Sequence, residues 1–250
     1  MELTTFFIVC PTVFLAGFVD AIGGGGGLIS LPGYMIAGVP THMAVATNKL
    51  SSSTGTLIST IRLCMNSKID FLLALPAIVL AYIGSTAGAM LSMMIPELYL
   101  KGALLVILPI TAYFVIRKDV LTEEKGGMIS RRKTMVIAWI AAVIIGLYDG
   151  LYGPGTGTFY IIVFMSMAKM TTMEAAVNTK LLNLTSNLAA LLTFLLHGQV
   201  YILLGLVASV FSIAGHYIGA GLVMKNGSKI VKPIICIVLC LLFIKIILGL

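Results

Sequence analysis

Residues 181–224 read LLNLTSNLAALLTFLLHGQVYILLGLVASVFSIAGHYIGAGLVM, a run without aspartate, glutamate, lysine or arginine. A second charge-free run covers residues 71–96. A helix needs about 20 apolar residues to cross the hydrocarbon core of a bilayer, so both runs have spanning length. The chain is 59% hydrophobic and only 10% charged, whereas a soluble domain carries about 25% charged residues. A water-soluble core would need charged surface between its helices, and these runs supply none.

The positive charge of the chain lies mostly between the apolar runs. The formal net charge is +7, and the densest cluster of cations flanks a polar stretch in mid-chain. This cluster consists of Arg117, Lys118, Lys125, Arg131, Arg132 and Lys133. It forms no stripe interleaved with aromatic residues, so nucleic acid is not an expected partner. By the positive-inside rule the mid-chain loop faces the cytoplasm. The segment from Leu3 lacks a cationic leader and a small-residue cleavage site, and is expected to remain as a first span.

The sequence repeats itself at a period of about 130 residues. Gly17-Phe-Val-Asp20 returns as Gly146-Leu-Tyr-Asp149, and the glycine run 23–27 is matched by Gly-Pro-Gly-Thr-Gly at 153–157. The offset is 129 residues up to this point and 131 residues beyond it, where Thr-Asn-Lys at 47–49 is matched by Asn-Thr-Lys at 178–180. Ordered matches along a whole half indicate a duplication. Glycines 84 and 88 match glycines 215 and 219, and this small-residue spacing is typical of helix packing in membranes.

The expected fold is an all-α integral membrane protein of about eight transmembrane helices, arranged as two four-span repeats. Each repeat contains one glycine-rich broken or re-entrant segment, at 27–38 and 157–168, because these segments are too short to cross alone. The first repeat is expected over residues 1–118, a cytoplasmic connecting loop over 119–132, and the second repeat over 133–250. The predicted spans are 4–22, 42–64, 71–93, 97–116, 134–150, 173–195, 201–223 and 230–249.

The relative orientation of the two repeats depends on how many times each one crosses. Four full crossings give parallel repeats, whereas an odd number, with a short segment counted as a passage, gives inverted repeats. The count of full-length spans favours parallel repeats. It also places Lys225, Lys229 and Lys232 outside the cell, in conflict with the positive-inside rule.

Four ionisable residues lie deep in the apolar runs: Asp20, Lys49, Asp149 and Lys180. A charge at mid-bilayer costs about 2.5 to 3.5 kcal/mol on insertion scales, so each must face a cavity or a partner. They form two repeat-related pairs beside broken helices, a pattern typical of a substrate site at a repeat interface. The alternative for each lysine is that its side chain extends from a helix end to the membrane surface.

The residue types around these charges favour a small anion as substrate. Half-helix N-termini that follow the glycine runs would direct backbone N–H groups and partial positive charge towards it. The two lysines would add full positive charge, and hydroxyl and amide side chains would add neutral donors. The predicted substrate-binding residues are Lys49, Lys180, Thr47, Asn48, Asn178, Thr179, Gly24, Gly25, Gly26, Gly155, Thr156 and Gly157.

Asp20 and Asp149 each close the first helix of a repeat. A carboxylate in a poorly solvated site holds a proton more readily, so either could carry a proton during transport. The alternative is a local cap, in which the carboxylate only accepts hydrogen bonds from nearby backbone N–H groups. Polar residues further along, at 51–54 and at 183, 186 and 187, are expected either to line a path or to bond between helices. Neither the cysteines nor the histidines form a ligand set, so no metal or cofactor is predicted.

The sequence from Gly17 to Gly27, followed by Thr47-Asn48-Lys49 and its second copy ending in Lys180, resembles the TauE/SafE family of sulfite and sulfonate exporters. The resemblance covers nearly the whole chain. It implies transport of sulfite, sulfonates, sulfoacetate or related organosulfur anions across the cytoplasmic membrane, coupled to protons. A passive anion channel is the alternative. A membrane enzyme is not expected, because no nucleophile and base pair is visible. The expected partners are the anion and the lipid bilayer, with a homodimer as a further option.

Overall fold

The computed structural model describes residues 2–65, 67, 69–100, 102, 106 and 129–226, and all regular structure among them is helical. Five of these helices are long and apolar enough to cross a membrane. The spans expected over 97–116 and 230–249, and most of the loop 119–132, lie outside the described residues. The helices are α1 (Leu3–Gly23), α2 (Gly27–Ile36), α3 (Thr41–Met65), α4 (Phe71–Met94), α6 (Arg131–Leu151), α7 (Thr156–Ile162), the π-helical η2 (Val163–Met167), α8 (Thr172–Leu196) and α9 (Ile202–Asn226).

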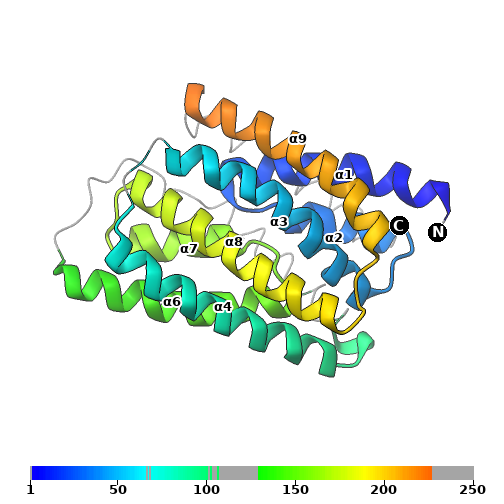
Figure 1. The fold of residues 1–250 in the computed structure, drawn as a ribbon, viewed down its shortest axis with the longest axis horizontal. Helices are drawn as coiled ribbons and strands as arrows, with labels where there is room; N and C mark the ends of the chain where they lie inside the picture. Colours follow the sequence, from blue (N-terminus) through cyan, green and yellow to red (C-terminus); the bar gives the residue numbers. More distant parts are fainter. Residues whose placement is uncertain are drawn as a thin grey trace.

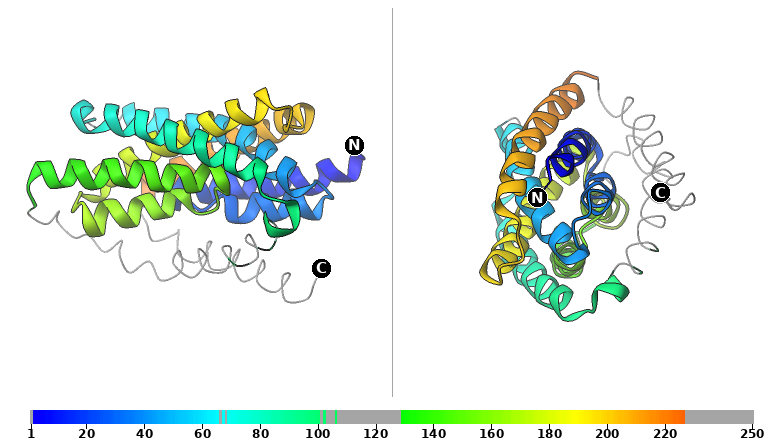
Figure 2. Two further views of the ribbon diagram at one scale, coloured as in Figure 1. Left: turned by 90° about the horizontal axis from the view of Figure 1, so that it is seen from below. Right: turned by 90° about the vertical axis from the view of Figure 1, so that its right-hand side faces the viewer.

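The helices form two layers. Helices α9, α3, α8 and α4 follow one another in a curved sheet-like layer, and α1, α2, α7 and α6 lie on its concave side (Figures 1 and 2). Helices α2 and α7 are the short segments expected after the glycine runs, and neither has the length of a span. They lie inside the bundle, where neighbouring helices surround their exposed backbone ends.

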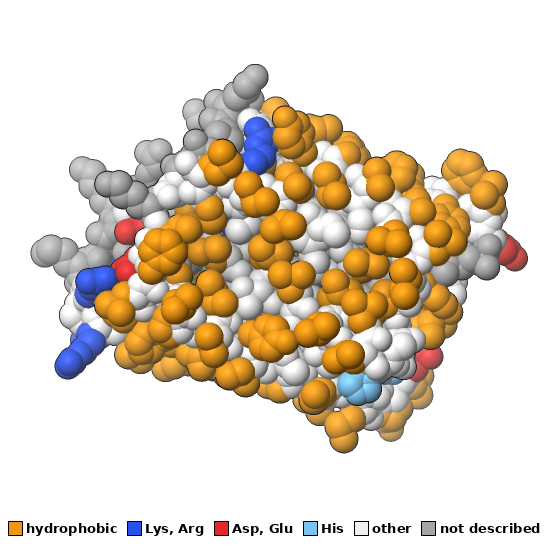
Figure 3. All heavy atoms as spheres, in the orientation of Figure 1, with side chains coloured by type: hydrophobic (Ala, Val, Ile, Leu, Met, Phe, Trp, Pro, Cys, Tyr) orange, Lys and Arg blue, Asp and Glu red, His pale blue; other side chains and the backbone are white. Residues whose placement is uncertain are grey.

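The described part of the molecule is apolar outside and polar inside. Large hydrophobic side chains such as Phe7, Ile144 and Val210 are exposed on its flanks, and Figure 3 shows them over most of one face. The interior holds charged and polar side chains, among them Lys49 and Asp149, each about 1% exposed. This distribution is the reverse of a soluble protein and suits a hydrocarbon surrounding.

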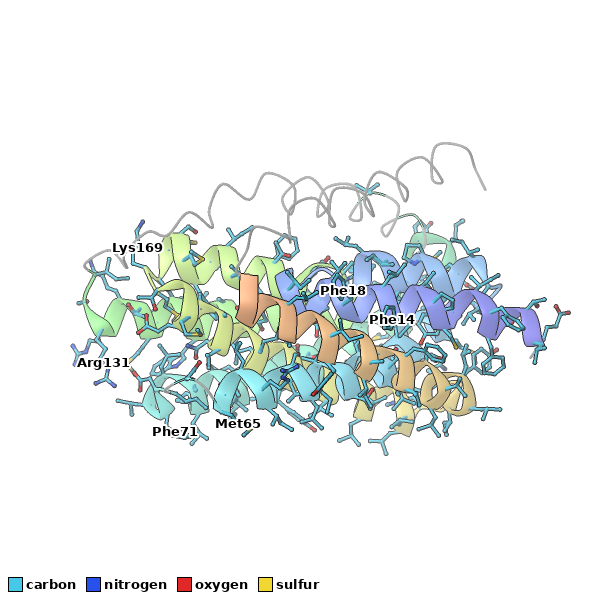
Figure 4. The ribbon with its side chains drawn as sticks, turned by 90° about the horizontal axis from the view of Figure 1, so that it is seen from above. Phe14, Phe18, Met65, Phe71, Arg131 and Lys169 are labelled. Atoms are coloured by element: carbon cyan, nitrogen blue, oxygen red, sulfur yellow. The ribbon has the colours of Figure 1, made fainter. Side chains whose placement is uncertain are left out.

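Corresponding helices of the two repeats run in opposite directions. Met65 ends α3 at the end of the molecule that also holds Lys169, just before α8 begins (Figure 4). Two contacts confirm the antiparallel order: Thr60 on α3 donates to the Lys180 carbonyl at 3.3 Å, while Lys49 reaches Asn187. Helix α6 likewise begins at that end, whereas α1 begins at the other (Figures 1 and 4).

The favoured parallel arrangement is therefore wrong for the described residues, and the repeats are inverted. The reason is the half-helix: α2 carries the chain back towards the end at which α1 began, so it counts as a passage. Inversion also removes the conflict over the end of α9, because Asn226 lies at the same end as Arg131, the start of α6 (Figure 1). Lys229 and Lys232 lie outside the described residues.

The paired glycines pack helices of different repeats together. A Cβ at Gly84 or Gly88 would meet the backbone of α6 around Val143 and Leu147. A Cβ at Gly215 or Gly219 would meet the backbone of α1, at Phe14 and Phe18 respectively. The expectation that these glycines are helix-packing contacts is confirmed. The α4–α6 and α1–α9 pairs thus join the first repeat to the second on both sides of the molecule.

Candidate functional site

The two glycine turns meet at the centre of the molecule. Gly24, with φ 75°, ends α1 in the left-handed conformation that glycine adopts without strain. Its carbonyl accepts hydrogen bonds from the backbone N–H of Thr158 at 3.1 Å and from the Thr158 hydroxyl at 3.2 Å. A Cβ at Gly24 would lie 2.7 Å from the Cα of Gly157. The starts of α2 and α7 are therefore held close together, as the glycine runs predicted.

Lys49 of α3 forms a buried ion pair with Asp149 of α6. Its Nζ lies 2.9 Å from Asp149 Oδ1 and donates to Asn187 Oδ1 at 3.0 Å. Asp149 also accepts the Thr156 hydroxyl at 2.7 Å and the Ser186 hydroxyl at 2.6 Å. Every partner of this carboxylate is thus a donor that needs no additional proton.

Lys180 of α8 forms the repeat-related ion pair with Asp20 of α1. Its Nζ lies 3.1 Å from Asp20 Oδ2 and donates to the Asp20 carbonyl at 2.6 Å. The other carboxylate oxygen, Oδ1, accepts the backbone N–H of Gly26 at 3.2 Å. The Nε2 atom of His216 lies 3.2 Å from Asp20 Oδ2.

Each ion pair joins one repeat to the other. Lys49 and Asp20 belong to the first repeat, and their partners Asp149 and Lys180 belong to the second. Both lysines are buried, so neither extends its ammonium group to the membrane surface. The sequence treated the lysines as free positive charge and the aspartates as separate proton carriers. The structure instead places each ammonium on a carboxylate, and the Asp20 carboxylate also accepts the local cap bond from Gly26.

A central cavity lies between the two ion pairs. It holds about 450 Å³ of atom-free space, its mouth included, and both aspartates, Lys49 and His216 line it. Of the predicted substrate-binding residues it reaches Gly24, Gly26, Asn48, Lys49, Gly155, Thr156 and Gly157. Polar side chains that the sequence left between two roles also line it: Ser52, Asn183 and Asn187.

Some predicted substrate-binding residues have other partners. The Thr47 hydroxyl oxygen accepts the backbone N–H of Tyr201 at 3.1 Å. The Asn178 amide donates to the Glu174 carbonyl at 2.9 Å, within its own helix. Gly25 is not among the residues that line the central cavity. Thr179 and Lys180 line a second cavity instead.

The second cavity lies between the centre and the cationic end. It reaches Arg62 and Leu63, in the last turns of α3 before Met65, which Figure 4 places at that end. Its further lining residues are Ala21, Ile22, Gly24, Ser59, Ile161, Ala176, Thr179, Lys180 and Ala220. Gly24 lines both cavities, and the Lys180–Asp20 pair lies between them, with Asp20 on the central cavity and Lys180 on the second.

The corresponding region of the other repeat is closed. Adding or subtracting the repeat offset of 131 relates four residues of the second cavity to four members of one buried apolar cluster. The pairs are Ser59 with Ala190, Leu63 with Phe194, Ala176 with Val45, and Ala220 with Ala89. Leu31, Leu100 and Tyr152 complete this cluster, which we call the apolar plug. Positions related by the repeat therefore form an open cavity at one end and a packed plug towards the other.

Two repeat-related polar atoms lack hydrogen-bond partners. Asn48 and Thr179 precede the two lysines and are 131 residues apart. Asn48 Oδ1 and Thr179 Oγ1 are buried without a partner, and each residue lines one of the two cavities. Buried polar groups are nearly always paired, so such atoms point to a ligand or water that the protein binds.

His216 is the site residue that sequence reasoning missed. It lies inside α9, 2% exposed, against both Asp20 and the central cavity. The sequence signal was its i+4 spacing from Ser212, which places two polar side chains on one face of an otherwise apolar span. Among the described residues no group of three or more His, Cys, Asp or Glu side chains could hold a metal ion.

Comparison with known proteins gives one family. The family model described as "Sulfite exporter TauE/SafE" matches residues 9–246. "Probable membrane transporter protein ORF9" of Sinorhizobium sp is 33% identical over 93% of this chain and 88% of its own length. "Probable membrane transporter protein YfcA" of Escherichia coli K12 is 34% identical over 90% of this chain and 82% of its own. A "Probable membrane transporter protein" of Haemophilus influenzae is 32% identical over 90% and 87%. No solved structure matches the chain.

Proposed function

Because the chain belongs to the TauE/SafE family of membrane transporters, we propose that it carries a small sulfur-containing anion across the cytoplasmic membrane. The cargo would be sulfite, a sulfonate, sulfoacetate or a related oxyanion, and its movement would be coupled to protons. The protein would act as a secondary transporter, with no enzymatic step.

The observation that carries this proposal is the pair of buried lysine–aspartate contacts on the central cavity. Four charges at membrane depth are expensive, and in membrane proteins such charges mark substrate and ion pathways. Here the two ammonium and two carboxylate groups sum to zero, so the empty site has no net charge from them. An anion that arrives beside Lys49 would compete with Asp149 for the ammonium, which links substrate binding to the contact between the repeats.

The cavity also offers neutral groups suited to an oxyanion. Asn48 lines it with an unpartnered amide oxygen, and the amide group as a whole can turn to present its N–H₂. The first residues of α2 line the same cavity, and a helix N-terminus favours negative charge. We assign Lys49 and Asn48 to the anion in the central cavity, and Thr179 and Lys180 to its passage through the second cavity.

Alternating access follows from the inverted repeats. In the state described, the second cavity extends towards the cationic end, which the positive-inside rule places in the cytoplasm. The apolar plug closes the repeat-related region. Exchange of conformations between the two repeats would pack the cavity residues together and open the plug, so that the central site would face the other side.

A passive anion channel is the second candidate, and the polar interior alone would suit it. It would need a path open to both sides at once, whereas the plug of Tyr152, Phe194 and their neighbours closes one side here. We therefore favour the transporter.

The test is counterflow in proteoliposomes loaded with unlabelled ethanesulfonate, with labelled ethanesulfonate outside and sulfite as competitor. A transporter exchanges the label transiently against its gradient and saturates, and a channel does neither. Lys49→Ala is expected to abolish the exchange, because it removes the cavity ammonium. Lys133→Ala, which changes an exposed lysine of the cationic end, is the matched control and should exchange like the wild type. Flux that is linear in concentration, with conductance, would support the channel instead.

A further inference from the structure

The two ion pairs are related by the repeat, but their surroundings differ at two positions. His216 corresponds to Ser85, and Gly55 corresponds to Ser186, both at the offset of 131. In the second repeat's pair, Ser186 donates its hydroxyl to Asp149, and Ser85 donates to the Ser186 carbonyl at 2.6 Å. In the first repeat's pair, the imidazole of His216 takes the place of the serine hydroxyl on Asp20.

Gly55 makes room for the imidazole. A Cβ at Gly55 would overlap the His216 ring and the Ser212 hydroxyl, and a Cβ at Gly17 would lie 2.7 Å from His216 Nδ1. A histidine at 216 therefore requires small residues on both α1 and α3. The exchange of serine for glycine at 55 and serine for histidine at 216 is a coupled change that favours an imidazole at only one of the two pairs.

The hydrogen bonds of His216 fix where its protons lie. Nδ1 lies 3.0 Å from the Ser212 carbonyl oxygen, which only accepts, so Nδ1 carries a hydrogen. In the neutral ring Nε2 would then present a lone pair to Asp20 Oδ2 at 3.2 Å, and two acceptors would face each other. A proton must lie between them, on the imidazole or on the carboxylate. No such proton is needed at Asp149, whose partners are an ammonium and two hydroxyls.

We propose that the Asp20–His216 contact is the proton-binding site of the transporter, and that the Lys49–Asp149 pair does not exchange protons. This deepens the proposed function and rests on it. With the proton bound, Asp20, Lys180 and His216 together carry one net positive charge, and without it they carry none. The charged groups that face this site are Asp20 on α1, Lys49 on α3 and Lys180 on α8, with Arg62 further along α3 towards the cationic end.

Proton binding and anion binding are therefore expected to favour each other. His216 and Lys49 line the same central cavity, so the additional positive charge attracts an anion there, and the anion in turn stabilises the proton. The two effects are equal because linkage is reciprocal. Proton and anion would move in the same direction, and loss of either would favour the neutral, ion-paired site.

The flux experiment copies the second pair onto the first. The double variant His216→Ser with Gly55→Ser gives Asp20 the surroundings of Asp149, and it avoids the overlap that Gly55→Ser alone would create. In proteoliposomes with a pH difference of one unit, one coupled proton drives about tenfold accumulation of ethanesulfonate in the wild type. We expect the ratio to fall to about one in the double variant. Unchanged accumulation in a folded double variant overturns the proposal.

A second measurement does not depend on transport. The chain has three histidines, so the ¹⁵N resonances of His216 in labelled protein are those absent from His216→Gln. We expect them to change between the neutral and the charged ring across the neutral pH range, and the midpoint to move in Asp20→Asn. A ring with one fixed protonation state overturns the proposal even if flux is normal. Wild-type protein without ethanesulfonate counterflow contradicts the proposed function, while the histidine titration still decides whether this contact binds a proton.

Discussion

The Lys49 ammonium lies 2.9 Å from Asp149 Oδ1, and each side chain is 2% exposed. This contact joins the two repeats through charges that neither lipid nor water can screen. It differs in kind from the pair between Arg131 and Asp70 at the cationic end, which has a similar distance of 3.0 Å but side chains that are 67% and 42% exposed.

Removal of one partner of the buried pair is expected to destabilise the protein. Asp149→Ala leaves the Lys49 ammonium buried and uncompensated, at a cost of about 3–5 kcal/mol. Arg131→Ala, the matched change at the exposed pair, should cost about 0–1 kcal/mol. Melting temperature of the purified protein in detergent measures both.

The double variant Lys49→Leu with Asp149→Leu separates stability from function. It removes both charges, so it should recover much of the lost stability, and it should still be inactive in counterflow. A double variant that is less stable than Asp149→Ala would mean that the two groups do not act as a pair.

The contact between the glycine turns predicts a position-specific effect of a single methyl group. Gly24→Ala introduces a Cβ that would lie 2.7 Å from the Cα of Gly157, in addition to a residue with φ 75°. Gly38 has a similar φ of 80° with open space around it, so Gly38→Ala should lose only about 1–2 kcal/mol. Gly24→Ala should lose clearly more, because backbone must move. Equal losses in melting temperature would show that the central contact is looser than described.

The chain's broken helices and buried charges could be read from the sequence because each is local. Charge-free runs, glycine runs and repeat-related lysines and aspartates are visible without knowing the fold. The inverted orientation was missed because it depends on whether a ten-residue segment turns back, which no periodicity states. The pairing of Lys49 with Asp149, and of Lys180 with Asp20, was missed because it follows from that orientation.

His216 was missed for a related reason. Its role depends on the absence of a side chain at Gly55, a residue far away in sequence on another helix. Conversely, Thr47 and Asn178 were assigned to the substrate because they flank the lysines. On a helix, neighbours in sequence point to different faces, and the hydroxyl oxygen of one and the amide group of the other bond elsewhere.

The unpartnered hydroxyl of Thr179 gives a third prediction. Thr179→Val replaces a buried oxygen without a hydrogen bond by a methyl group, so it should leave stability unchanged or raise it by about 1 kcal/mol. Flux should fall, because the second cavity loses a polar group. Thr158→Val is the control, since that hydroxyl donates to the Gly24 carbonyl, and its loss should cost about 1 kcal/mol. A loss of stability at Thr179→Val equal to that at Thr158→Val would indicate an unrecognised partner.

The difference between the second cavity and the plug predicts which side of the membrane reaches each. Leu63 and Phe194 are related by the repeat, yet Leu63 lines the cavity and Phe194 is 1% exposed within the plug. In a variant without the four native cysteines, Leu63→Cys should react with a membrane-impermeant thiol reagent from the cytoplasmic side. If the plug opens in fewer than about one molecule in ten, Phe194→Cys should react about tenfold more slowly from the opposite side. During ethanesulfonate exchange, Phe194→Cys should become faster and Leu63→Cys slower, because each turnover exchanges the two conformations. Equal acceleration at both positions would instead mean that the two ends open together, as in a channel.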